Sequence, residues 1–302
     1  MGNIFAICQP ILHGVMKLAG VRPQTLEIEP GTVMNFWVPS ETNSKKSKPA
    51  VVFLHGFAVD GIITWQFQVL SLARDYAVYV PDLIFFGGSI TDKPDRSPEF
   101  QAECVAKGLR KLGVKRCTLV GLSYGGMVGF KMAELYPDMV EAVVVTCSVM
   151  ALTKSVSDAG LGRIGFSRWS DYLLPDSVKG VRDIFEIAAY EFPHLPDWIY
   201  RQYLKVMFDN RKEREELLEA LVIRDEDFTV PNFPQRVYLL WGANDDIFDI
   251  DTASDLNRQL GNNASVDLIE KAGHLVQMER PFMYNRQLRK FLASLSDDVH
   301  HD

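Results

Sequence analysis

The segment Gly121-Leu122-Ser123-Tyr124-Gly125 places a serine midway between two glycines, where an apolar strand pattern gives way to a helical one. A serine on such a tight turn is held in a strained backbone with its hydroxyl exposed, and the residues two positions away must be small for the turn to close. The helix that follows points its positive N-terminal end at negative charge developing there. The pattern predicts a nucleophilic Ser123 supported structurally by Gly121 and Gly125.

A serine nucleophile needs a general base, and the chain offers six histidines. Four of them lie in the N-terminal segment, in a long helical insertion or in the C-terminal tail, namely His13, His194, His300 and His301. His55 ends an early strand pattern and precedes the serine. His274 follows the last strand pattern, in Lys271-Ala272-Gly273-His274, downstream of the serine. We therefore predict that His274 is the base.

The base needs an acid to orient it, and a suitable carboxylate is expected between serine and histidine at the end of a strand. The apolar run 236–242 is followed at once by a turn that carries Asp245, Asp246 and Asp249. One of these carboxylates completes the order Ser, Asp, His.

These residues need a scaffold that brings the ends of several strands together. Short, continuous apolar runs alternate with longer helical patterns, which is typical of strands buried on both faces of a parallel sheet. We predict an antiparallel strand pair around Glu29-Pro30-Gly31, and then strands at 51–56, 77–83, 116–123, 141–147, 236–242 and 265–270. Helices are expected at 64–74, 98–112, 124–135, 252–260 and 281–294. The alternation predicts an α/β fold with a doubly wound, mostly parallel sheet.

One crossover is much longer than the others. Residues 149–229 separate two strand patterns and are rich in aromatic side chains at helical spacing, so we expect a helical cap inserted after the sixth strand. The body of the domain is then 26–148 together with 230–295. An N-terminal amphipathic segment, 1–25, precedes it, and a disordered tail, 296–302, follows it.

Four turns carry a family resemblance: His55-Gly56, the serine turn, Trp241-Gly242-Ala243-Asn244-Asp245 and Gly273-His274. Together they resemble the α/β-hydrolase superfamily over about residues 26–295. The cap and the segment PDLIFFGGS are similar to lid-bearing plant hydrolases of the epoxide-hydrolase-like and monoacylglycerol-lipase-like groups. The resemblance implies Ser123 as nucleophile, Asp245 as acid and His274 as base.

The same resemblance implies further roles around the serine. An oxyanion hole is formed by the backbone N–H groups of Phe57 and Tyr124, and His55 and Gly56 support the loop that carries Phe57. The family pattern requires no cofactor, and we expect no metal. The four cysteines are spaced too widely for a metal knuckle.

The serine decides the expected chemistry. Epoxide hydrolases and dehalogenases of this superfamily carry an aspartate at the elbow, whereas this chain carries Ser123. We expect acyl transfer to water through an acyl-enzyme, as in an esterase, a lipase or a thioesterase, and favour an ester hydrolase of the carboxylesterase or lipase type. The substrate is expected to carry a small to medium apolar acyl or aromatic group, because the cap and Phe57, Phe85 and Phe86 are apolar. Alternatives are C–C bond hydrolysis, a lyase or cyclase with the same triad, and a small-ligand receptor.

Composition bounds the partners. The 302 residues include 32 Lys and Arg against 39 Asp and Glu, a net charge of −7, so nucleic acid is excluded as an expected partner. Few cysteines favour a reducing, cytoplasmic compartment.

The N-terminal segment lacks a basic region and is interrupted by Gln9, Pro10, His13 and Lys17, so neither a signal peptide nor a membrane span is predicted. We expect instead an amphipathic helix that packs on the body or contacts a membrane surface. Gly2 and Cys8 suggest acylation, but Ala6 stands where the myristoylation pattern has Ser or Thr.

Overall fold

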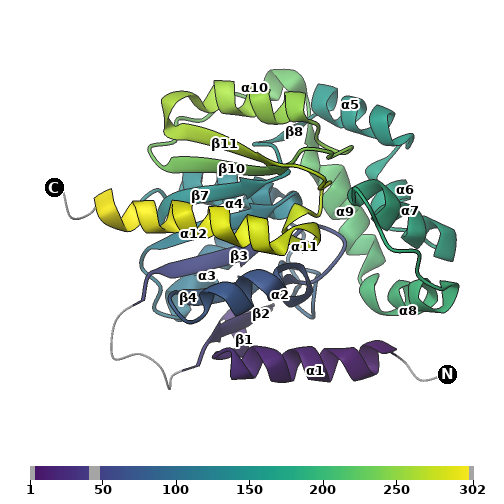
Figure 1. The fold of residues 1–302 in the computed structure, drawn as a ribbon, viewed down its shortest axis with the longest axis horizontal. Coiled ribbons are helices and arrows are strands. Elements are labelled where there is room, and N and C mark those ends of the chain that lie inside the picture. Colours follow the sequence, from purple (N-terminus) through teal and green to yellow (C-terminus); the bar gives the residue numbers. More distant parts are fainter. Residues whose placement is uncertain (1–3, 41–47, 299–302) are drawn as a thin grey trace.

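The fold is built on a large, mostly parallel β-sheet (Figure 1). The computed structural model describes residues 4–40 and 48–298, and within them the main sheet has nine strands. They are β1 (Val21–Glu29), β2 (Thr32–Pro39), β3 (Ala50–Leu54), β4 (Ala77–Pro81), β5 (Ile90–Thr91), β6 (Cys117–Leu122), β7 (Val140–Thr146), β10 (Arg236–Gly242) and β11 (Ala264–Ile269). The order across the sheet is β1-β2-β4-β3-β6-β7-β10-β11, and β5 pairs with β2. The pairs that involve β2 are antiparallel, and the others are parallel.

The inner strands are apolar along almost their whole length because helices cover both faces of the sheet. All six residues of β6 are buried. In β7 and β10 only Glu141 and Arg236, near the start of each strand, are exposed. These strands are therefore exposed to solvent near their amino ends and buried at their carboxyl ends.

Two helical layers sandwich the sheet. The helices outside the long insertion are α1 (Ile4–Leu18), α2 (Gly61–Leu72), α3 (Pro98–Lys111), α4 (Tyr124–Leu135), α10 (Ile250–Leu260), α11 (Val276–Glu279) and α12 (Pro281–Asp298). In Figure 1, α2 and α12 lie in front of the sheet, and α3 and α4 lie behind it. Helix α1 packs against β1, α2 and α8 at the lower edge.

The long insertion lies to one side of the sheet, beyond the carboxyl ends of its strands (Figure 1). It contains β8 (Leu152–Thr153), α5 (Lys154–Ile164), α6 (Trp169–Leu173), α7 (Val178–Ala188), α8 (Asp197–Met207), α9 (Arg211–Leu221), β9 (Val222–Ile223) and the 3₁₀ turn η2 (Asp225–Asp227). Strands β8 and β9 pair in parallel, so the insertion leaves and re-enters the body at one place. We refer to residues 149–229 as the cap.

The doubly wound, mostly parallel α/β sheet expected from the sequence is confirmed. Each expected strand and helix is present, with boundaries that differ by a few residues. Helix α2 starts three residues early, because the Asp60 carboxylate accepts the Ile63 N–H and caps its first turn. The short strands β5, β8 and β9 were not expected, since two-residue strands have no periodicity to detect.

The ends of the chain differ from the expectation. Strand β1 begins at Val21, which pairs with Pro39, so the last residues of the expected segment 1–25 belong to the sheet. Alternating half-exposed residues on this edge strand hide it from a search for apolar runs. Helix α12 continues to Asp298, so the first three residues of the expected tail 296–302 are helical. The rest of that tail, the start of the chain through residue 3 and the linker 41–47 lie outside the described residues.

The four cysteines are unpaired, and only Cys8 is exposed. Among the helices of the described residues, none combines the length and the apolar character needed to cross a membrane.

Candidate active site

Ser123 occupies the turn between β6 and α4 with a left-handed backbone, φ 51° and ψ −118°. A non-glycine residue in this region is strained by roughly 1–3 kcal/mol unless its surroundings hold it. Here its N–H donates to the Thr146 carbonyl at 3.0 Å, and its own carbonyl accepts from the Gly126 N–H at 2.8 Å and the Ser148 hydroxyl at 2.6 Å. The Met127 N–H also donates to this carbonyl, at 3.2 Å, so four hydrogen bonds fix the strained residue.

The glycines around the serine are required by close backbone contacts. A Cβ on Gly121 would lie 2.5 Å from the Gly125 carbonyl oxygen. A Cβ on Gly125 would lie 2.3 Å from the Leu54 carbonyl oxygen and 2.6 Å from that of His55. The first turn of α4 thus presses against the end of β3, which no larger residue would permit.

Asp245 and His274 are brought into direct contact from two different turns. Asp245 follows β10 and His274 follows β11, and the His274 Nδ1 lies 2.9 Å from Asp245 Oδ2. The other carboxylate oxygen accepts the backbone N–H groups of Ile247 and Phe248 at 2.8 and 3.1 Å. Both side chains are more than nine-tenths buried. The carboxylate is therefore fixed on one side and free to orient the imidazole on the other.

The two neighbouring acids lie elsewhere. Asp246 is exposed. Asp249 caps α10 through the Thr252 N–H and forms an ion pair with Arg163. Of the three carboxylates in this turn, Asp245 is the one hydrogen-bonded to the histidine.

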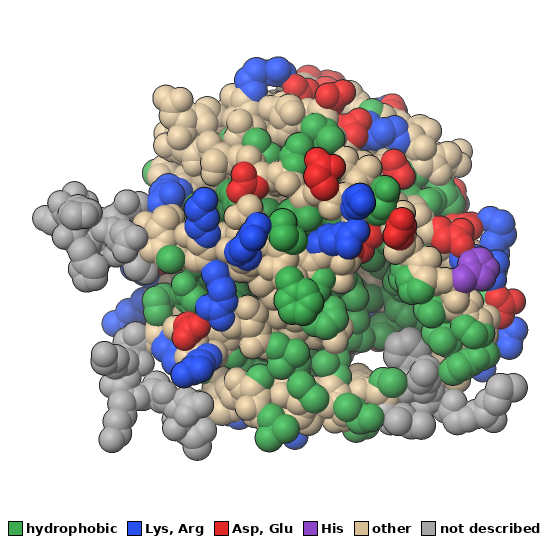
Figure 2. Space-filling view, viewed as in Figure 1, with side chains coloured by type: hydrophobic (Ala, Val, Ile, Leu, Met, Phe, Trp, Pro, Cys, Tyr) green, Lys and Arg blue, Asp and Glu red, His purple; other side chains and the backbone are tan. Residues whose placement is uncertain are grey.

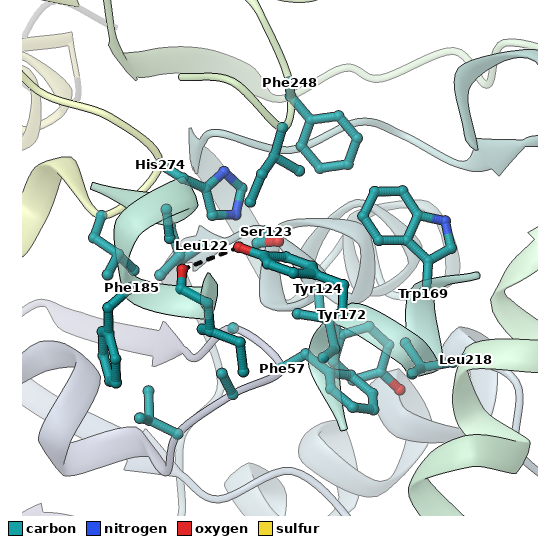
Figure 3. A pocket seen from close by; sticks show the side chains of 18 of the residues that line it. Phe57, Leu122, Ser123, Tyr124, Trp169, Tyr172, Phe185, Leu218, Phe248 and His274 are labelled. Atoms are coloured by element: carbon teal, nitrogen blue, oxygen red, sulfur yellow. Dashed lines mark hydrogen bonds between the residues drawn. The ribbon is translucent and has the colours of Figure 1, made fainter. Parts of the chain in front are cut away.

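Ser123 and His274 line the same pocket and lie next to each other in Figure 3. Within the described part of the chain the serine hydroxyl forms no hydrogen bond with the imidazole. Catalytic hydrogen bonds in ligand-free sites are commonly long and tighten when substrate binds. The structure thus joins Asp245 to His274, and brings Ser123 to the same cavity.

The positions expected to form an oxyanion hole flank the serine. Tyr124 is the first residue of α4, so its N–H has no acceptor within the helix. Phe57 lies in the loop after β3, and both residues line the pocket. Their rings pack edge to face, with centroids 5.6 Å apart.

His55 lies beneath this loop and is fully buried. Its Nε2 accepts the Leu83 N–H at 2.9 Å, and its Nδ1 lies 2.7 Å from the Gly56 carbonyl oxygen, to which it donates in that tautomer. Burial lowers the pKa of His55 from 6.5 to about 4. The neutral ring thus ties the loop after β3 to the loop after β4, which is the geometry of a structural support.

The cavity beside these residues has a volume of about 280 Å³ and apolar walls (Figure 3). No Lys, Arg, Asp or Glu is among the described residues that line it. The cap supplies much of the wall, including Trp169, Tyr172 and Phe185. The Tyr172 hydroxyl donates to the Ile184 carbonyl oxygen, as the dashed line in Figure 3 marks. Trp198, on α8, is not part of the lining.

Glu279 is a positioning residue that the sequence analysis missed. One carboxylate oxygen accepts the Gly273 N–H at 2.7 Å, and the other accepts the Tyr190 N–H at 2.8 Å. The Leu275 N–H also donates to the Ala188 carbonyl of the cap. The turn that carries His274 is therefore bonded directly to the end of α7. A glutamate on a short helix carries no sequence signal for this role.

Arg214 makes the corresponding connection on the other side of the site. This buried side chain of α9 donates to the carbonyl oxygens of Phe85 and Met207 and pairs with Asp209. Its guanidinium also lies 4.3 Å from the centre of the Phe86 ring, which packs on Phe57. The cap is thus anchored to the aromatic cluster behind the expected oxyanion hole.

Cys147 lies beside the acid and the base. Its Sγ, a carboxylate oxygen of Asp245 and a ring nitrogen of His274 fall within 4.8 Å of one another, a donor set that could hold a metal ion. Burial and the adjacent Asp245 raise the pKa of the Cys147 thiol well above its ordinary value. Because the thiolate is the form that binds metals, and Asp245 and His274 already bond each other, this group fits a metal poorly.

Comparison with known proteins places the chain among hydrolases. The sequence profile of the Alpha/beta hydrolase family matches residues 51–286. Human epoxide hydrolase 4 is 22% identical, with 82% of this chain and 73% of its own length aligned. Human monoacylglycerol lipase ABHD6 is 24% identical, with 82% and 76% aligned.

Solved structures show the same fold. The candidate lipase lip1 of Acinetobacter baumannii superposes with a TM-score of 0.82 at 20% identity, covering 96% of this chain and 97% of its own. The 2-hydroxy-6-oxo-6-phenylhexa-2,4-dienoate hydrolase of Rhodococcus superposes with a TM-score of 0.73 at 21% identity, covering 90% and 99%. None of these four proteins is from a plant, so the expected similarity to plant hydrolases stays a prediction.

The contact between Gly125 and β3 can be tested by comparing two glycine substitutions in the same helix. Gly125→Ala should destabilise the protein by at least about 2 kcal/mol, because its Cβ would overlap backbone atoms that cannot move aside. Gly129→Ala, one turn later on α4, would place its Cβ at 3.6 Å from Leu54 Cδ1 and should be neutral or stabilising by up to about 1 kcal/mol. Urea unfolding measures both, and equal effects would show that the turn tolerates a side chain.

Burial of neutral His55 should make stability depend on pH. Its pKa is about 4 when folded and near 6.5 when unfolded, so between these values the unfolded chain binds more protons. The contribution of His55 is full above pH 6.5 and falls, by up to about 1.4 kcal/mol per pH unit, as the pH drops towards 4.

Urea unfolding at a series of pH values checks this dependence. His55→Gln should be less stable at neutral pH and should show a shallower loss between pH 6.5 and 4. His194→Gln, an exposed histidine of the cap, is the control and should keep the wild-type slope. An unchanged slope in His55→Gln would mean that His55 is not the titrating group.

Proposed function

The chain belongs to the alpha/beta hydrolase family, and from that premise we propose that it is a serine hydrolase that cleaves esters of apolar acyl or aromatic groups. The observation that carries the proposal is the hydrogen bond of 2.9 Å between His274 and Asp245, in the pocket that also holds the strained Ser123. A chain with a non-catalytic pocket has no need to keep a strained serine, a base and an oriented acid together.

The proposed reaction begins at Ser123. The free Nε2 of His274 takes the hydroxyl proton while the serine oxygen attacks the ester carbonyl. Asp245 holds Nδ1 protonated and stabilises the imidazolium that forms. The N–H groups of Phe57 and Tyr124 would bind the tetrahedral oxyanion, each contributing about 3 kcal/mol.

Collapse of that intermediate releases the alcohol, which takes the proton from His274, and leaves the acyl group esterified to Ser123. Water then attacks the acyl-enzyme and gives its proton to the same imidazole. The acid is released as His274 returns the proton to the serine. No cofactor enters any of these steps.

The pocket favours an uncharged, apolar substrate. Among the described residues that line it there is no basic or acidic side chain, and burying an unpaired anion there would be costly. A volume of about 280 Å³ suits a small to medium acyl or aromatic group. A dienoate such as the one named in the Rhodococcus hydrolase would bring a carboxylate with no cation to pair it, so C–C bond hydrolysis is the less favoured alternative.

The relatives named as epoxide hydrolases and as a monoacylglycerol lipase point to different chemistry. Opening an epoxide through an ester intermediate needs a carboxylate at the nucleophile position. This chain has Ser123 there, which supports acyl transfer.

A substrate panel tests the proposal. Purified protein is assayed with p-nitrophenyl esters from acetate to palmitate, and with a thioester, a diketone and an epoxide in parallel. Ester turnover that an organophosphonate abolishes by labelling Ser123 is the expected result. Turnover of the diketone alone would favour the C–C hydrolase, and binding without turnover of any compound would favour the receptor.

The roles of Ser123 and Asp245 are tested by matched substitutions. Ser123→Ala and Asp245→Asn should each lower kcat by about a thousandfold or more, because the triad acts as a unit and the asparagine leaves the imidazole in the wrong tautomer. Asp246→Asn, an exposed neighbour in the same turn, should stay close to wild type. If Asp246→Asn were the inactive variant instead, the acid would be assigned to the wrong residue.

The chain-length profile tests the pocket. Each added methylene of a fitting acyl chain should raise kcat/KM by up to about fourfold, equivalent to 0.8 kcal/mol, until the cavity is full. Trp169→Ala should flatten this climb and move the optimum to longer chains, since Trp169 lines the cavity. Trp198→Ala is the control in the same cap and should leave the profile unchanged. A wild-type profile that declines from acetate onward would instead mean that the cap closes over a small substrate.

A further inference from the structure

One side of the body carries an exposed apolar surface that is unusual for a protein of this charge. It is formed by α1, α2 and the start of α12, which contact one another through α2. Its apolar residues, with more than a third of each side chain exposed, are Ile11, Val15, Leu18, Phe67, Leu70, Phe282 and Met283. We call this set the α1–α2–α12 face. Figure 2 shows it as the hydrophobic area in the middle and lower part of the view.

The most exposed residues of this face contribute little to the packing of the protein core. Leu18 and Phe282 are each 90% exposed, and Ile11 is 61% exposed. Single exposed apolar residues are ordinary, but several of them on three helices that contact one another through α2 indicate a surface that binds something apolar. Helix α2 is informative because Trp65 and Val69 are buried against the core while Phe67 and Leu70 face solvent. A helix that is apolar on both sides is typical of one covered on both sides.

Cations border this face although the chain has a net charge of −7. Lys17 of α1, Arg74 just after α2, and Arg286 and Lys290 of α12 are exposed. Phe282, Arg286 and Lys290 are spaced four residues apart, so they share one face of α12. In the part of the chain that the structure describes, none of the four cations forms an ion pair.

The face adjoins the pocket. Ile63 of α2 lines the cavity, and Phe67 lies one turn further along the same helix. Met278 of α11 also lines it, four residues before Phe282. The same two segments thus form part of the cavity wall and part of the exposed face.

We propose that the α1–α2–α12 face docks on an anionic lipid bilayer, with its apolar residues inserted at the interface and its four cations on lipid phosphates. An apolar surface with a basic border is the composition that interfacial helices use. A second copy of this chain fits less well, because a symmetric pairing would bring the same four cations against each other. The proposal does not depend on catalysis, since it concerns binding alone.

Vesicle co-sedimentation tests the proposal on the full chain. Vesicles of phosphatidylcholine alone are compared with vesicles that also contain phosphatidylserine, using Ser123→Ala protein so that lipid turnover cannot interfere. The wild-type surface should bind the anionic vesicles more tightly, and added salt should weaken that binding. The double variant Arg286→Gln with Lys290→Gln should bind about 25-fold less tightly, at about fivefold for each cation lost.

The apolar part is tested by Leu18→Glu with Phe282→Glu, which should lower binding at least about tenfold. Both side chains are 90% exposed, so these changes leave the core intact. The matched controls carry the same changes away from the face. They are Leu135→Glu with Leu268→Glu, and Lys212→Gln with Arg258→Gln, all at exposed positions. Both controls should bind as wild type.

The outcomes separate this proposal from the proposed function. The face variants are also made in protein that keeps Ser123. Their hydrolysis of a soluble short-chain ester should equal that of wild type, because none of the changed residues lines the pocket. Absence of wild-type binding to anionic vesicles, or equal binding by face variants and controls, would overturn the docking proposal and leave the esterase proposal standing. Concentration-dependent dimerisation abolished by Leu18→Glu with Phe282→Glu, without vesicle binding, would assign the face to a second copy of the chain.

Discussion

The rest of the site depends on two places where backbones touch without side chains between them. At Gly125, the first turn of α4 meets the carbonyl groups at the end of β3, which sets the serine turn against the loop of Phe57. At Gly242, a Cβ would lie 2.0 Å from the Gly273 carbonyl oxygen, so the turn of the acid is pressed against the turn of the base. Each contact fixes one half of the site, and parallel strands of one sheet fix the halves relative to each other.

The cap is bonded to both halves, so its position and the geometry of the site are linked. Glu279 joins the end of α7 to the backbone beside His274. Arg214 joins α9 to Phe85 and to the aromatic cluster behind Phe57. Both contacts include hydrogen bonds between a charged side chain and a backbone group, and such charge-assisted bonds are stronger than neutral ones. A cap held in this way is part of the site, because it contacts the segments that position the site residues.

The sequence was informative for the candidate site residues that lie at the ends of strands. Ser123, Asp245 and His274 each follow an apolar strand, and a parallel sheet brings such ends to one edge. Turn motifs are local, so the fold class and these positions could be read from the chain. Glu279 and Arg214 could not, because Glu279 bonds the backbone of Tyr190 and Arg214 that of Phe85, both distant in sequence. The difference between Trp169 and Trp198 was equally hidden, since which way an aromatic ring of the cap faces depends on how five helices pack.

Polar contacts and apolar surfaces have different roles at the site. The polar contacts to Ser123 and Asp245 hold these residues in place, and the described residues that line the cavity beside them include no charged side chain. In the proposed hydrolase, substrate selection would therefore depend on shape and on apolar contact, which are graded rather than all-or-none. Helix α2 carries this apolar character from Ile63 in the cavity to Phe67 on the surface. In the proposed hydrolase, an apolar substrate would meet no charged side chain among the described residues that line the cavity, whereas an anion would lose its hydration there without a cation to pair with it.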